Sequence, residues 1–170
     1  VNPYILIDYV AEAEERVVKL DDEELIVAFL DLMENHKMVA ENSGLLTIAA
    51  LKHMNVENKK IVSIISGGNM DVITMSSMVQ HGLIARDRVF TVSVLLPDKP
   101  GELVQVAQTI AEAQGNVIKL EHNQFVSTNR NAAVELRITM EAFGTEHKQE
   151  ILKALEKKGY RPRLIGAKLY

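Results

Sequence analysis

Cysteine is absent from this sequence. The chain therefore has no disulfide, no thiol nucleophile and no thiolate metal site, which fits a reducing compartment such as the cytoplasm. Its 5 histidines show no metal-ligand spacing, so we predict no metal site. No apolar run reaches the roughly 20 residues that a membrane-spanning helix needs, so we expect no membrane partner.

The sequence also lacks an excess of basic residues. There are 19 lysines and arginines against 23 acidic residues, and the net charge is -4 at pH 7. Because the basic residues are scattered and outnumbered, a nucleic-acid-binding surface is excluded. The 47% hydrophobic and 25% charged residues are the mix of a globular protein, and 170 residues allow one domain or two small ones.

The composition changes near Gly82 to Asp87, so we predict two domains, residues 1–85 and 86–170. In the first, carboxylates at 21–24 precede apolar residues at three- and four-residue spacing, which predicts a helix ending at 35–37. A second helix is expected from Leu45 to about Met54. It is apolar almost all round and should be deeply packed. A third is expected from about Asp71 to His81.

Residues 61–65, Ile-Val-Ser-Ile-Ile, are nearly continuously apolar and predict a strand. Such strands usually lie in parallel sheets that are covered on both faces. One strand among three helices cannot build such a sheet, so we expect partner strands in sequence that is missing here. The alternative is a small helical domain with one unpaired strand.

The second domain has a more regular pattern. Strands are expected at 88–96, 116–126, 132–141 and 160–168, and helices at 101–114 and from Thr145 to Gly159. This β-α-β-β-α-β order is the split arrangement of ferredoxin-like folds. Pro162 would lie on an edge strand, where a missing N–H is tolerated.

Residues 86–170 resemble an ACT domain, a regulatory module of enzymes in amino-acid metabolism. The most specific segment is Leu96-Pro-Asp-Lys-Pro-Gly-Glu-Leu103, where the family carries D-x-P-G-x-L. Gly101 lets the backbone approach a ligand, and the N–H groups of the following helix suit a carboxylate. The alternative is that this segment is only a tight turn.

The resemblance implies an amino-acid effector bound between two paired ACT domains of a homo-oligomer. The natural candidate is isoleucine, and valine would oppose it. The residues expected to bind the effector are Asp98, Pro100, Gly101, Glu102 and Leu103 from one copy and Asn116, Val117 and Ile118 from the other.

Residues 1–85 resemble part of the catalytic domain of threonine and serine dehydratases, which use pyridoxal phosphate (PLP). The likeness is carried by Val39-Ala-Glu-Asn-Ser-Gly44, which departs from V-x-E-G-A-G at Asn42 and Ser43, and by Ser66-Gly-Gly-Asn69, which matches S-G-G-N. The resemblance implies cofactor-binding roles for Ser66, Gly67, Gly68, Asn69 and Glu41, with the Ser66 hydroxyl facing the pyridine nitrogen. The alternative is a structural turn in which Asn69 caps the next helix.

The implied fold class is α/β: a partial PLP fold-type-II catalytic domain, with helices around a short parallel sheet, followed by an α+β ferredoxin-like ACT domain. The family's S-F-K-x-R-G lysine and glycine-rich phosphate loop do not occur in this sequence, so we assign no catalytic residue. We expect the C-terminal, regulatory portion of a threonine dehydratase, which converts threonine to 2-oxobutyrate and ammonia, and expect this chain alone to be inactive. The alternative is a stand-alone amino-acid receptor, in which residues 1–84 would enclose a closed core.

Overall fold

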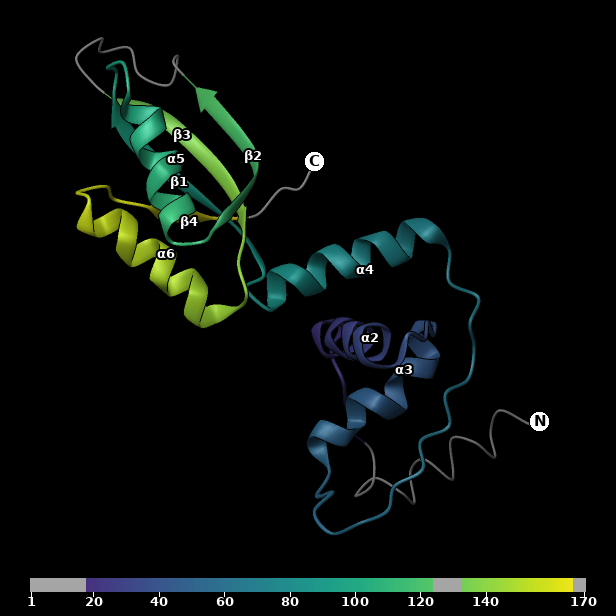
Figure 1. Ribbon diagram of the computed structural model, residues 1–170. Coiled ribbons are helices and arrows are strands. Elements are labelled where there is room, and N and C mark those ends of the chain that lie inside the picture. Colours follow the sequence, from purple (N-terminus) through teal and green to yellow (C-terminus); the bar gives the residue numbers. More distant parts are fainter. Residues whose placement is uncertain (1–17, 124–132, 167–170) are drawn as a thin grey trace. The chain divides into compact units, whose positions relative to one another are not determined.

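The computed structural model describes residues 18–123 and 133–166 (Figure 1). The chain divides into two compact units, Val1–Val79 and Gln80–Tyr170, and each is described by itself. The division falls within one helix, somewhat before the boundary expected between residues 85 and 86, which stays a prediction. Among the described residues, no helix has the length and apolar character to cross a membrane.

The first helix among the described residues of the first unit is α2, Asp22–His36, as the sequence predicts. Asp21 accepts a hydrogen bond from the backbone N–H of Glu24, and the Glu24 side chain accepts one from the N–H of Asp21, which together form a capping box. The helix ends at Lys37, whose φ of 58° is left-handed. The buried face is formed by Ala28, Phe29, Leu30 and Leu32.

The second helix differs from its prediction. Helix α3 spans Asn42–Ala49 and continues into a short 3-10 helix, η2, Ala50–His53. Residues 42–44, which precede the predicted start at Leu45, form its first helical turn. The expectation of deep packing was wrong: Gly44, Leu45 and Ala49 are buried, but Leu46 is 45% exposed.

The strand expected at 61–65 does not form. Residues 54–71 contain neither helix nor strand, and within residues 18–79 there is no sheet with which the segment could pair. The short parallel sheet predicted for this unit is therefore absent from the part of the chain described. Val62 and Ile64 are 89% and 77% exposed. Helix α4, Val72–Ala85, follows and is longer than predicted.

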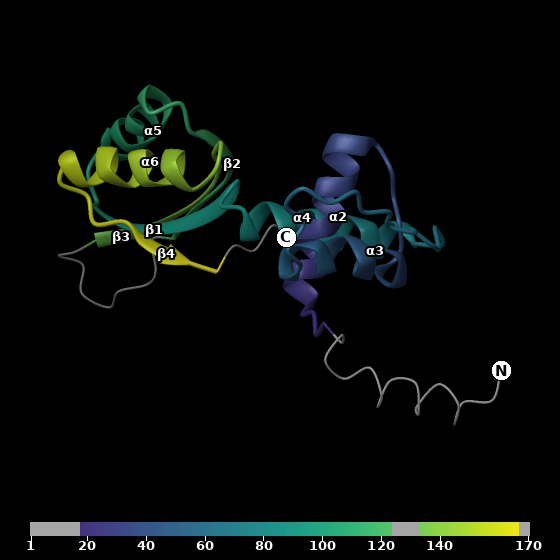
Figure 2. The same ribbon diagram turned by 90° about the horizontal axis from the view of Figure 1, so that it is seen from below.

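The second unit confirms the ferredoxin-like prediction. Its elements are β1 (Val89–Pro97), α5 (Glu102–Glu112), β2 (Asn116–Asn123), β3 (Ala133–Glu141), α6 (Thr145–Lys157) and β4 (Arg163–Ile165). The antiparallel sheet has the order β2-β3-β1-β4, so β2 and β4 are the edges and Pro162 directly precedes an edge strand. Both helices cover one face of the sheet (Figure 2). Residues 127–131, between the strands expected at 116–126 and 132–141, lie outside the described residues.

The core of this unit follows from period-two alternation along its central strands. Residues of β1 and β3 that face the helices are almost fully buried, and so are the apolar faces of α5 and α6; this cluster includes Phe90, Val92, Val94, Leu96, Val106, Ile110, Leu136, Ile138, Met140, Ile151 and Leu155. Each such side chain contributes about 1.5–3 kcal/mol on burial. The alternate residues of β1 and β3 form the other face, which is mixed in polarity, and there the hydroxyls of Thr91 and Thr139 lie 2.9 Å apart.

Candidate cofactor and effector sites

In the first unit, the two turns assigned to the cofactor lie side by side. The backbone N–H of Glu41 donates to the Gly67 carbonyl at 3.2 Å. At Gly44, an added Cβ would lie 2.1 Å from the Ser66 carbonyl oxygen, so a side chain cannot be accommodated there. The turn at 39–44 and the turn at 66–69, far apart in sequence, thus form one local structure.

The Glu41 carboxylate packs against the backbone of the second turn. Gly67 has a φ of 81°, and a Cβ built on it would lie 2.2 Å from Oε1 of Glu41. Ser43 donates a hydrogen bond from its Oγ to the same oxygen at 2.7 Å. Ser43 departs from the V-x-E-G-A-G pattern, and its hydroxyl holds the carboxylate of Glu41, the glutamate of that pattern.

A cavity of about 280 Å³ opens beside these turns and is lined by Glu41, Asn42, Ser43, Asn69, Met70, Asp71 and Thr74. Two of the predicted cofactor residues, Glu41 and Asn69, face it together. Ser66, Gly67 and Gly68 are exposed and do not belong to its lining.

Asp71, rather than Asn69, caps helix α4. Its Oδ1 accepts hydrogen bonds from the N–H groups of Ile73 and Thr74 at 3.0 and 2.9 Å. The Thr74 hydroxyl, and after it the Thr74 N–H, lower the pKa of the Asp71 carboxyl below its usual value. The alternative in which Asn69 serves as the helix cap was wrong, since a carboxylate directly before the apolar run takes that position.

The segment 61–65 is held against helix α3 by hydroxyl groups. Ser63 donates to Thr47 at 2.6 Å, and the Thr47 hydroxyl donates to the carbonyl of Ile64 at 3.3 Å. Ile65 packs against the buried cluster of the first unit. Ser63 and Ile65 therefore face inward, and the alternate residues Val62 and Ile64 face solvent.

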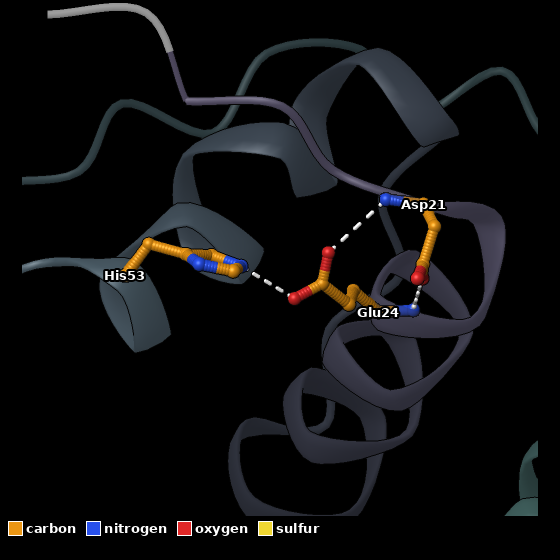
Figure 3. Close-up of polar contacts among 3 residues, drawn as sticks. All are labelled: Asp21, Glu24 and His53. Atoms are coloured by element: carbon orange, nitrogen blue, oxygen red, sulfur yellow. Dashed lines mark hydrogen bonds and ion pairs between the residues drawn. The ribbon is translucent and has the colours of Figure 1, made fainter.

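A hydrogen bond between Glu24 and His53 joins α2 to η2 (Figure 3). Oε1 of Glu24 lies 2.5 Å from Nε2 of His53, and its other oxygen accepts from the Asp21 N–H at 3.1 Å. The hydrogen bond from the Asp21 N–H, followed by that from His53, lowers the pKa of Glu24. These are structural contacts: within residues 18–123 and 133–166 no group of three or more potential ligands could hold a metal ion.

In the second unit, the candidate effector loop lies open at the start of α5. Asp98 and Pro100 are exposed. Gly101 is the N-cap with a φ of 94°; it makes no side-chain cap, and no described atom lies within 4 Å of the position that a Cβ would take there. Its carbonyl accepts from the N–H of Gln105 at 3.0 Å. The Glu102 N–H donates to the Lys99 carbonyl at 3.5 Å, and no side chain of the N-cap covers the N–H groups that follow it in the first turn of α5, which suit an anion.

Tyr160, which the sequence did not single out, packs against the core of this unit. Burial is the main cause that raises the pKa of the Tyr160 phenol, and the charge of Glu102, the first residue of α5, raises it further. The sequence offered one signal for Tyr160: it is an aromatic residue directly after Gly159, the glycine that follows the predicted helix. Leu103 packs against the core, so its side chain anchors the loop.

The other predicted effector residues begin strand β2. Asn116 is exposed and donates from Nδ2 to the Glu141 carboxylate at 2.7 Å. The pairing with β3 shifts register between Val117 and Lys119, which places a bulge at Ile118, a half-exposed residue. Helix α5, Glu102–Glu112, is about 16 Å long at 1.5 Å per residue, and Gly101 and Asn116 flank its opposite ends.

The fold and the loop geometry agree with the family comparison. Residues 90–159 match the ACT domain family, so the second unit is an ACT domain. L-threonine ammonia-lyase of Geobacter sulfurreducens is 36% identical over 148 residues, 86% of this chain and 37% of that protein. L-threonine ammonia-lyase of Thermotoga maritima is 31% identical over 153 residues, 89% of this chain and 38% of that protein.

A protein named L-threonine dehydratase biosynthetic IlvA, from Pasteurella multocida, is 29% identical over 150 residues, 85% of this chain and 28% of its own length. This chain is therefore a relative of the L-threonine ammonia-lyases and spans less than two fifths of the length of the relatives it matches. Among solved structures, prephenate dehydratase from Streptococcus mutans is 22% identical, with a TM-score of 0.41, over 47% of this chain and 42% of that one.

Proposed function

We propose that this chain is the regulatory portion of a PLP-dependent threonine dehydratase, in which the ACT domain binds an amino-acid effector and the first unit completes the catalytic domain. The ACT match over residues 90–159 and the similarity to threonine ammonia-lyases over most of the chain support this proposal. Threonine would lose water and ammonia to give 2-oxobutyrate.

The proposal that the first unit completes the catalytic domain rests on the contact between the segments 39–44 and 66–69. A side chain at Gly44 would clash with the Ser66 carbonyl, and one at Gly67 would clash with the Glu41 carboxylate. Both positions therefore need glycine for the two segments to lie in contact. Beside them, Val62, Ile64, Val72 and Ile73 are strongly exposed. Such apolar exposure is typical of a surface that another part of the protein covers.

The residues present fit one side of a PLP site. Ser66, Gly67, Gly68 and Asn69 offer a hydroxyl, an unhindered backbone and an amide, and the Glu41 carboxylate is fixed beside them by Ser43. When bound, PLP would supply an electron sink for loss of the α-proton of threonine. Lys37, Lys52, Lys59 and Lys60, the lysines nearest these turns in sequence, are exposed, so the lysine that holds PLP would come from outside this chain.

The effector site would form between two copies of the ACT domain. Gly101 and the open start of α5 would receive the α-carboxylate, and Asn116 to Ile118 of a second copy would complete the site, because one copy holds the two sets at opposite ends of α5. Isoleucine is the proposed effector and valine its opponent. An effector changes activity only through a difference in its affinity for two states of the oligomer, so regulation requires this pairing.

A calorimetric titration of the chain with L-isoleucine tests the effector assignment. We expect saturable binding that Gly101→Val abolishes, because a side chain at a φ of 94° strains the loop and blocks the approach of a ligand. Gly159→Ala, at another left-handed glycine with open space around it, is the matched control and should bind isoleucine normally. Equal binding by Gly101→Val would contradict the assignment.

A second experiment addresses catalysis. The purified chain is mixed with PLP and threonine, and 2-oxobutyrate is followed over time. We expect no turnover, since the sequence offers no S-F-K-x-R-G lysine. Sustained production of 2-oxobutyrate would show that the chain carries a complete catalytic site and would refute this division of roles.

A stand-alone amino-acid receptor is the second candidate. It predicts a closed core in the first unit, but the apolar side chains of segment 61–65 alternate between contact with the buried cluster and open solvent. That exposure favours the regulatory portion of a larger enzyme.

A further inference from the structure

A groove lies between the two helices of the ACT domain. Helices α5 and α6 lie side by side over one face of the sheet (Figure 2). A cavity of about 510 Å³ between them is lined by Thr109, Glu112, Ala113, Ala154, Lys157 and Lys158. We call this cavity the interhelix groove. Its volume falls in the range of about 300–1,000 Å³ that is typical of small-molecule sites.

The wall formed by α5 presents hydrogen-bond acceptors. The Glu112 carboxylate is held by its own helix, since Gln108 donates from Nε2 to its Oε1 at 2.9 Å. Thr109 is only 4% exposed, and its hydroxyl donates to the Gln105 carbonyl at 2.7 Å. Because this hydroxyl has used its proton, its oxygen can only accept a hydrogen bond from a ligand. A carboxylate and a hydroxyl oxygen in this state suit an ammonium group.

The wall formed by the end of α6 presents hydrogen-bond donors. Lys157 and Lys158 are exposed, and among the described residues neither ammonium group makes a hydrogen bond or an ion pair. Lysines are favoured at a helix C-terminus by the helix dipole, but that attraction leaves their N–H donors unused. Glu112 lines the same groove without pairing with them. Two unpaired ammonium groups suit two carboxylates.

We propose that the interhelix groove binds an amino dicarboxylate, the chemical class of L-aspartate and L-glutamate. The ammonium group of the ligand would bind Glu112 and Thr109, and its two carboxylates would bind Lys157 and Lys158. A ligand of this class carries a net charge of −1, which complements the two lysines and one glutamate of the lining. The site lies within one copy of the ACT domain, so it does not depend on the effector site proposed at Gly101.

Calorimetric titration of the chain with L-glutamate and, separately, L-aspartate at low ionic strength tests the site. We expect saturable binding of at least one of them. The double variant Lys157→Gln with Lys158→Gln should lower that affinity at least tenfold, because it removes the hydrogen bonds from charged donors. Lys153→Gln, an exposed lysine of α6 outside the lining, is the matched control and should bind normally. No saturable binding, or equal affinity in the double variant, would overturn the proposal.

The role of the α5 wall is tested with glutarate, which is L-glutamate without its ammonium group. Glu112→Gln should weaken L-glutamate binding about tenfold, since the charged partner of the ammonium group is lost. The same variant should bind glutarate at least as well as the wild-type chain. Its thermal unfolding temperature should change little, because the side chain is exposed. An equal loss of affinity for both ligands would show a purely structural role for Glu112 and overturn the proposal.

Gly101→Val separates this inference from the effector assignment. The variant should lose isoleucine binding and bind L-glutamate as the wild-type chain does, because Gly101 does not line the groove. If isoleucine fails to bind the wild-type chain while L-glutamate binds, the effector assignment is wrong and the groove is supported. Equal loss of both ligands in Gly101→Val would place L-glutamate at the effector loop and overturn the groove as its site.

Discussion

In the ACT domain, alternate residues of β1 and β3 enter a continuous core under two helices, and Val92, Leu136 and Ile138 are fully buried. In the first unit, the buried cluster is small, and Phe29, Leu45 and Met78 are among its members. Large apolar side chains elsewhere in that unit remain exposed, with Val62 at 89%. The comparison indicates that the ACT domain has the more extensive buried core among the described residues, and it supports the proposal that the first unit completes a larger structure.

The largest difference between the units should appear on truncating a leucine in each. Leu136→Ala in β3 leaves a cavity in a closed core and should cost about 3 kcal/mol of unfolding free energy. Leu46→Ala in α3 removes a half-exposed side chain from a helix and should change stability by no more than about 0.5 kcal/mol. Urea unfolding followed by circular dichroism measures both, and equal losses would contradict the comparison.

The contact between the two turns can be broken at a single glycine. Gly67→Ala places a methyl group on the Glu41 carboxylate in a left-handed conformation, and should destabilise the first unit by about 2 kcal/mol. Gly68→Ala is the matched control, because no described atom lies within 4 Å of its added Cβ. Thermal unfolding compares them. Similar unfolding temperatures for the two variants would mean that the turns do not meet as described.

A pH-dependent contribution is expected in the ACT domain from Asp87. Its carboxylate pairs with Lys148 at 2.6 Å and accepts from the Thr145 hydroxyl at 2.9 Å. Lys148 is the main cause of the lowered pKa of Asp87. The stabilisation is therefore present above the ordinary carboxyl pKa and is lost as the pH falls through the lowered value.

Asp87→Asn should reduce the unfolding free energy by about 1 kcal/mol at pH 7. The gap between variant and wild type should close as the pH falls below about 4. Urea unfolding at several pH values checks this, and a gap that widens on acidification would reverse the assigned sign.

The smallest effect on stability is expected at the outward positions of segment 61–65. Ile64→Thr replaces an exposed side chain and should leave the unfolding free energy within about 0.5 kcal/mol while reducing self-association. Ile65→Thr, one position along, alters a side chain that packs on the buried cluster and should destabilise the unit. Unfolding and analytical ultracentrifugation distinguish them. The opposite ranking would show that the segment faces the other way.

The ACT fold could be predicted from the sequence because its signals are local. Strict alternation over 132–141, glycines after both helices and Pro162 directly before an edge strand each indicate one element, and together they indicate the order of the sheet. The loop at 97–101 was predictable for the same reason, because Gly101 ends it and adopts the left-handed conformation that starts α5; its role in binding an effector stays a prediction.

The first unit was harder to predict because a strand is defined by its neighbours. The apolar pattern of 61–65 indicates a buried strand, but hydrogen bonds to another strand are needed to form one, and residues 18–79 supply none. Side-chain contacts between residues far apart in the sequence, such as Ser63 with Thr47 or Lys148 with Asp87, carry no periodic signal and could not be foreseen.

Hydrogen–deuterium exchange on the purified chain tests the contrast between the two units most directly. The account predicts slow exchange for the amides of β1 and β3 and rapid exchange for Val62 and Ile64, whose segment lacks a neighbouring strand among the described residues. Protection of residues 61–65 as strong as that of β1 would mean that the first unit forms a closed structure by itself, and would contradict the account.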